Sequence, residues 1–122
     1  MTEQPYSETI SCHDLEVPYF TEVISERMRS VLASGGYEKT EIQLLKNILR
    51  KGDRVLELGA GVGVVSAVAA QSIGAENVTA VEANPGLIPV IKETHRINGF
   101  DNITVIQGAA VPNPKTKTVP FY

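Results

Sequence analysis

The sequence is poor in cysteine, with Cys12 alone among 122 residues. A disulfide within the chain is therefore excluded. A metal site is also not expected, because only His13 and Asp14 stand beside Cys12, and further ligands at a workable spacing are missing. We expect these three residues to lie in an exposed loop or an edge strand.

Basic blocks and long apolar runs are missing as well. Lysine and arginine number 11 against 14 acidic residues, which gives a formal net charge of -3. The sequence therefore has no basic patch that would bind the backbone of a nucleic acid. The apolar runs are far shorter than a membrane span, and an acidic start with Glu3 and Glu8 does not resemble a signal peptide. We expect a cytoplasmic protein that binds neither nucleic acid nor a membrane.

The strongest local pattern runs from Asp53 to Glu82 and reads DRVLELGAGVGVVSAVAAQSIGAENVTAVE. A short apolar stretch, a glycine-rich turn, a mostly apolar helix and a second apolar stretch ending in an acid follow one another. This order predicts the strand–helix–strand unit of a nucleotide-type cofactor site.

Three short apolar segments predict parallel strands at regular intervals, namely 55–58, 78–81 and 103–106. We expect the first strand to be buried on both faces, as central parallel strands are. By the same rhythm a fourth strand would begin just beyond Tyr122. The predicted fold class is α/β, a Rossmann-like three-layer parallel sheet truncated after about three βα units, with N-terminal helices.

Periodic apolar positions predict four helices around these strands, over 20–32, 40–51, 62–73 and 84–97. We expect Thr21 to cap the first helix and a capping box at Thr40 to begin the second. Asn84 and Pro85 have the residue types of a cap and first turn for the fourth. His95 stands in a charged stretch of that helix and is expected on a solvated face.

These elements predict two parts of the chain. Residues 1–35 form an N-terminal extension with one helix, and residues 36–122 form a partial Rossmann-like domain. The tail ends in Val119-Pro120-Phe121-Tyr122. We expect this tail to be a loop that leads into an absent strand.

The turn alternates Gly59, Gly61 and Gly63. Glycine permits a sharp turn, often at positive φ, and lets a ligand approach the backbone, while the first helical amides face that ligand with partial positive charge. A dinucleotide fingerprint requires Gly-x-Gly-x-x-Gly or Ala, and its last position here is Val64. The spacing therefore departs from the pattern for a pyrophosphate.

Two acids flank the turn. Glu57, at the end of the first strand, suits a cationic amino group better than a pyrophosphate. Glu82 follows Gly59 at about the distance usual for the carboxylate that accepts both ribose hydroxyls, and it would repel a ribose phosphate. An ordinary tight turn without a ligand is the alternative, and the presence of both acids disfavours it.

With these residues the chain resembles a known family. ELGAGVG at 57–63, followed by VEANP at 81–85, looks like the first two motifs of class I S-adenosylmethionine-dependent methyltransferases. More narrowly, the run from GYE at 36–38 to NG at 98–99 is similar to the FkbM family of methyltransferases. The resemblance covers about residues 36–110 and implies a seven-stranded sheet of order 3-2-1-4-5-7-6, of which this chain holds strands 1 to 3.

The resemblance also implies S-adenosylmethionine as the cofactor and a set of residues around it: Glu57, Gly59, Ala60, Gly61, Gly63, Glu82, Ala83, Tyr37 and Gly108. The turn would wrap the methionine part, Glu57 would lie near the amino group, and Glu82 would hold the ribose hydroxyls. Ala83 would line the adenine, and Tyr37 would close the site. The third strand ends in Gln107-Gly108 without the acid common there, so Gln107 or a backbone group would contact the adenine instead.

Methyl transfer requires little from a protein beyond an in-line approach of the acceptor to the sulfonium methyl, helped by a general base where the acceptor is a hydroxyl. In the family both come from segments after the third strand, so no catalytic residue is assigned. We expect the cofactor half of a methyltransferase for a small-molecule or sugar hydroxyl, inactive alone. The alternatives are a homodimeric binding or structural module and a nicotinamide-nucleotide-binding protein.

Overall fold

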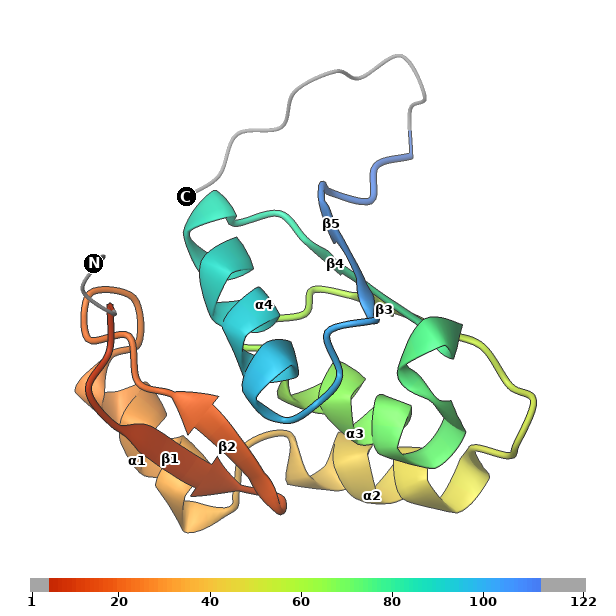
Figure 1. The fold of residues 1–122 in the computed structure, drawn as a ribbon, viewed down its shortest axis with the longest axis horizontal. Coiled ribbons are helices and arrows are strands. Elements are labelled where there is room, and N and C mark those ends of the chain that lie inside the picture. Colours follow the sequence, from red (N-terminus) through yellow and green to blue (C-terminus); the bar gives the residue numbers. More distant parts are fainter. Residues whose placement is uncertain (1–4, 113–122) are drawn as a thin grey trace.

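A computed structural model of the chain describes residues 5–112, which form a two-stranded hairpin, a three-stranded parallel sheet and the helices around them (Figure 1). The antiparallel hairpin pairs β1 (Thr9–Cys12) with β2 (Leu15–Pro18). The parallel sheet has the order β3-β4-β5, with bounds Val55–Leu58, Val78–Glu82 and Thr104–Gln107. The predicted Rossmann-like α/β fold is confirmed. The expectation for the tail at Val119–Tyr122 lies outside the described residues.

All four predicted helices are present and each is shorter than predicted: α1 (Glu26–Ser34), α2 (Lys39–Ile48), α3 (Val64–Ile73) and α4 (Ile88–Ile97). Helix α1 is also shifted toward the C-terminus of the predicted range 20–32. Short 3-10 turns at Ala75–Asn77 and Pro85–Leu87 precede β4 and α4. None of the helices within residues 5–112 is long and apolar enough to cross a membrane.

The helix starts correct two predictions and confirm a third. Ser25, not Thr21, caps α1, because its hydroxyl accepts from the Met28 amide at 3.1 Å. Helix α2 begins after Glu38 at φ 49° with no side-chain cap, so the capping box at Thr40 is wrong. Asn84 does cap its turn, since its Oδ1 accepts from the Gly86 amide at 2.9 Å. Caps depend on where the incoming chain turns, which local sequence alone does not fix.

Helix α3 lies at the centre of the packing, where it contacts β4, α2 and α4. Its small and β-branched side chains let it sit close to the sheet, and the buried ones are Val64, Ser66, Ala67, Val68, Ala69, Ala70 and Ile73. An apolar cluster joins the hairpin and α1 to this helix, and it contains Val17, Leu32, Ile42 and Val64. Buried side chains on both sides of residue 35 therefore share one core.

One face of the parallel sheet is not covered by any described helix, because α2, α3 and α4 all lie to one side of the strands (Figure 1). The register places Leu56 beside Thr79 and Leu58 beside Val81, so these side chains share the open face. Leu56 is 64% exposed and Leu58 is 59% exposed. The prediction that the first strand is buried on both faces is therefore wrong for residues 5–112.

Candidate functional site

The glycine turn joins β3 to α3 and is fastened to the end of β4. The amides of Gly59 and Ala60 both donate to the Val81 carbonyl, at 2.8 and 3.0 Å. Gly59, Gly61 and Gly63 have φ values of 85°, 60° and 87°, which only glycine adopts at little cost. The three glycines therefore permit the backbone conformation that starts α3 at the carboxyl edge of the sheet.

Glu82, at the end of β4, bridges this turn to the next loop. Its side chain is 8% exposed; Oε1 accepts from the Gly61 amide at 2.9 Å and Oε2 accepts from the Asn84 amide at 2.9 Å. A carboxylate oxygen can accept more than one hydrogen bond. Glu82 thus fixes both loops and keeps acceptor capacity for hydroxyl groups of a ligand.

Glu57 lies on the helix-covered face of β3, where it is paired in register with Ala80. Burial raises the pKa of its carboxyl to about 8, and the nearby carboxylates of Glu41 and Glu38 act in the same direction. Its Oε1 is buried and has no hydrogen-bond partner within the described part of the chain. A cationic donor beside Glu57 would stabilise the ionised form of this carboxyl.

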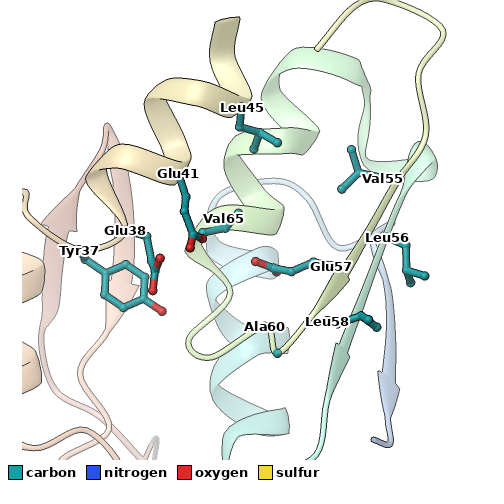
Figure 2. Close-up of a pocket in the computed structure, with 11 residues that line it drawn as sticks. Tyr37, Glu38, Glu41, Leu45, Val55, Leu56, Glu57, Leu58, Ala60 and Val65 are labelled. Atoms are coloured by element: carbon teal, nitrogen blue, oxygen red, sulfur yellow. The ribbon is translucent and has the colours of Figure 1, made fainter. Parts of the chain in front are cut away.

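A cavity of about 220 Å³ opens beside Glu57, between β3 and the start of α2. Figure 2 shows the Glu57 carboxyl pointing away from Leu56 and Leu58, toward the side where Tyr37 and Glu38 lie. The cavity therefore presents acids on one side and the glycine turn on the other, which suits a ligand with a positive charge near the turn.

Tyr37 lies over the glycine turn. A methyl group built on Gly61 would come within 2.7 Å of the Tyr37 hydroxyl. Burial raises the pKa of this hydroxyl to about 12, so it stays protonated. The Tyr37 carbonyl lies 2.7 Å from Nε2 of His13, in the turn of the hairpin. The N-terminal part of the chain thus positions a residue of the candidate site.

The hairpin packs against the core more closely than the sequence predicted. The prediction of an edge strand is right for β1, but Cys12 is only 3% exposed because it faces the shared core. The role of His13 was missed, since a contact over 24 residues leaves no local signal. Within residues 5–112 no group of three or more potential ligand side chains could hold a metal ion.

The remaining predicted residues border the same edge of the sheet. Ala60 is buried under the turn, and Ala83 directly follows Glu82. The Gly108 amide donates to the Glu82 carbonyl at 2.9 Å, so the end of β5 lies beside the acid. The structure thus brings the predicted cofactor residues of all three strands to one place.

His95 is the clearest error of the sequence analysis. It is 1% exposed, not solvated, and its Nε2 lies 2.7 Å from the hydroxyl of Ser66, which sequence reasoning did not single out. The signal was available, because His95 follows the buried Ile91 by one helical turn and so shares its inward face. Charged neighbours in the sequence concealed that periodicity.

Comparisons with known proteins agree with this geometry. Residues 7–111 match the sequence model of the family described as Protein-L-isoaspartate(D-aspartate) O-methyltransferase (PCMT). A ribosomal protein L11 methyltransferase of Acetivibrio thermocellus is 35% identical over 77 residues, covering 62% of this chain and 24% of that protein. A protein-L-isoaspartate O-methyltransferase of Ignicoccus hospitalis is 41% identical over 61 residues, covering 49% and 29%.

A solved structure matches the fold. The crystal structure of Trm5b from Pyrococcus abyssi superposes with a TM-score of 0.65 at 22% identity, over 88% of this chain and 30% of that one. The chain spans less than a third of the length of each of these proteins. The likeness to Trm5b shows the fold alone. The family model and the two relatives support an S-adenosylmethionine-dependent methyltransferase, but not the FkbM family specifically, which stays a prediction.

The tight contact at Gly63 yields a stability prediction. A Cβ at this residue would lie 3.2 Å from His95 Nε2 and from the Ile91 backbone, whereas a Cβ at Gly99 meets nothing within 4 Å, although both residues have positive φ. Gly99→Ala should cost about 1 kcal/mol of unfolding free energy from backbone strain, and Gly63→Ala about 1–3 kcal/mol more from overpacking. Urea unfolding measures both, and equal losses would contradict the contact.

Proposed function

The chain belongs to the Protein-L-isoaspartate(D-aspartate) O-methyltransferase (PCMT) family, and from this premise we propose that it forms the S-adenosylmethionine-binding part of a methyltransferase. The strongest support for the proposal is the Glu82 carboxylate, which links the loop after β3 to the loop after β4. A buried carboxylate at the end of β4 that already orders the Gly61 and Asn84 amides is preorganised to accept the two ribose hydroxyls.

The surrounding residues support the same orientation of the cofactor. Its amino group would lie at Glu57, whose unpartnered oxygen and acidic neighbours favour a cation. The turn from Gly59 to Gly63 would follow the methionine part, and Ala83 and Gly108 would border the adenine. Tyr37 would cover the turn.

The proposed acceptor atom is oxygen, which the family description as an O-methyltransferase supports. The narrower acceptor, a hydroxyl of a small molecule or sugar, rests on the FkbM resemblance. When bound, the cofactor supplies an electrophilic methyl group. The residues described in this chain bind and orient it, and we assign no general base among them.

Calorimetric titration with S-adenosylhomocysteine and with NAD tests the cofactor. We expect heat of binding with the first and none with the second, because Glu57 and Val64 disfavour a pyrophosphate nucleotide. Glu82→Ala should weaken binding by about 10- to 100-fold, since it removes charge-assisted hydrogen bonds. Glu76→Ala removes an exposed acid near the opposite end of β4 and is the matched control. Absence of heat at millimolar S-adenosylhomocysteine, or equal affinity for NAD, would overturn the proposal.

Glu57 makes binding pH-dependent. With its pKa raised from 4.5 to about 8, its carboxyl is mostly protonated at pH 7, and an ammonium group beside it should drive the proton off. We expect release of nearly one proton per cofactor at pH 7, measured by calorimetry in buffers of different ionisation enthalpy. Glu57→Gln should abolish this release, and a release unchanged in that variant would exclude Glu57 as its source.

The same shift affects the free protein. Because the folded pKa lies above the unfolded one, the contribution of Glu57 to stability is full below pH 4.5 and is lost as the pH rises through about 8. Unfolding measured across this range should show a smaller decline for Glu57→Gln than for the wild type.

A homodimeric module is the second candidate, and the exposed Leu56 and Leu58 favour it. Strand β3 pairs only with β4 among the described strands, and an apolar unpaired edge invites association with another copy. Light scattering should then give the mass of two chains, and the double variant Leu56→Thr, Leu58→Thr should give one. A single-chain mass for the wild type at high micromolar concentration would rule the dimer out.

A further inference from the structure

Beneath the glycine turn lies a buried polar cluster of His95, Ser66 and Gly63. It adjoins Glu57, because burial raises the pKa of that carboxyl and the Ser66 hydroxyl acts in the opposite direction to lower it. His95 of α4 places Nε2 2.7 Å from the Ser66 hydroxyl of α3. Ser66 donates in turn to the Gly63 carbonyl at 3.2 Å. Gly63 is the residue at which the turn becomes α3. A chain of hydrogen bonds therefore runs from the inner face of α4 to the backbone of the turn.

The hydrogen atoms in this chain can be assigned from the groups that need partners. The Ser66 hydroxyl has one hydrogen, which it donates to Gly63, so Nε2 of His95 carries the hydrogen donated to Ser66. Nδ1 is buried with no partner in the described part of the chain. In this tautomer Nδ1 carries a lone pair and no hydrogen, so no N–H group is left without an acceptor. Burial lowers the pKa of His95 to about 4, which keeps the ring neutral at physiological pH.

The orientation of one peptide group connects this cluster to the cofactor side of the turn. In a trans peptide the C=O and the following N–H point in opposite directions. Holding the Gly63 carbonyl toward Ser66 therefore aims the Val64 N–H outward, with the other free amides at the start of α3. The Ala67 amide donates to the same carbonyl at 3.2 Å and reports on its position.

We propose that His95 is a positioning residue for the cofactor, which acts through Ser66 to hold the Gly63 peptide so that the first amides of α3 face the ligand. The inference rests on the proposed function and extends it to a pair of residues that do not touch the cofactor. A purely structural His95 would stabilise the core without setting the affinity for the cofactor.

Paired substitutions separate the two roles. In His95→Gln the side-chain amide nitrogen reaches the place of Nε2, whereas the shorter side chain of His95→Asn reaches only the place of Nδ1. We expect His95→Asn and Ser66→Ala each to weaken S-adenosylhomocysteine binding about tenfold, and His95→Gln to stay within about twofold of the wild type. The double variant Ser66→Ala, His95→Asn should bind no more weakly than either single one, because both break the same chain.

A neighbouring buried residue provides the control. Thr94 is 0% exposed on the same helix and donates to the Val90 carbonyl at 2.9 Å, away from the turn. Thr94→Val should lower the unfolding midpoint without changing the affinity. If His95→Asn behaves like Thr94→Val, losing stability but not affinity, the positioning role is refuted.

Amide hydrogen exchange without cofactor keeps this test independent of the proposed function. In His95→Asn and Ser66→Ala, the Ala67 amide should exchange about tenfold faster relative to the Gly74 amide, which bonds Ala70 at the other end of α3. His95→Gln should preserve the wild-type ratio. If the wild type binds no S-adenosylhomocysteine, the proposed function fails, and the exchange ratio still tests whether His95 holds the Gly63 peptide. An unchanged ratio in His95→Asn overturns the inference.

Discussion

Glu82 joins two loops, because each oxygen of its carboxylate accepts a backbone amide from a different one. The Gly61 amide belongs to the turn after β3, and the Asn84 amide belongs to the loop after β4. Charge-assisted hydrogen bonds of this kind are stronger than neutral ones, and this pair is largely buried. The relative position of the two strand ends, and with it the shape of the cofactor site, depends on this single side chain.

The same edge of the sheet holds polar groups that the fold alone leaves incompletely satisfied. Glu57 keeps a buried oxygen without a partner in the described residues, and its pKa is raised accordingly. An unpartnered buried acceptor lowers stability, so its persistence beside the glycine turn is typical of a site built for a ligand. Tyr37, in the turn between α1 and α2, covers the glycine turn, and His13 of the N-terminal hairpin contacts the Tyr37 carbonyl. The buried acid that lowers the stability of the fold therefore lies where a bound cofactor would compensate for that loss.

The sequence predicted the parts of this arrangement that local patterns encode. The βαβ unit, the positive-φ glycines and the positions of Glu57 and Glu82 all follow from spacing along 30 or so residues. Contacts between distant segments were not predictable in this way: Leu56 is exposed because its face has no covering helix among the described residues. His95 is buried because Ser66, 29 residues away, supplies its partner. The cap at Ser25 likewise reflects how the hairpin delivers the chain to α1.

Backbone amide NMR of the ¹⁵N-labelled chain during titration with S-adenosylhomocysteine tests the central claim most directly, since it locates the ligand residue by residue. The account predicts that the largest shift changes fall on Gly59, Gly61, Val64 and Ala83, around the Glu82 bridge, while amides of the hairpin strand β1 (Thr9–Cys12) change little. Changes confined to the open face at Leu56 and Leu58, or no change at millimolar ligand, would contradict a cofactor site at this edge of the sheet.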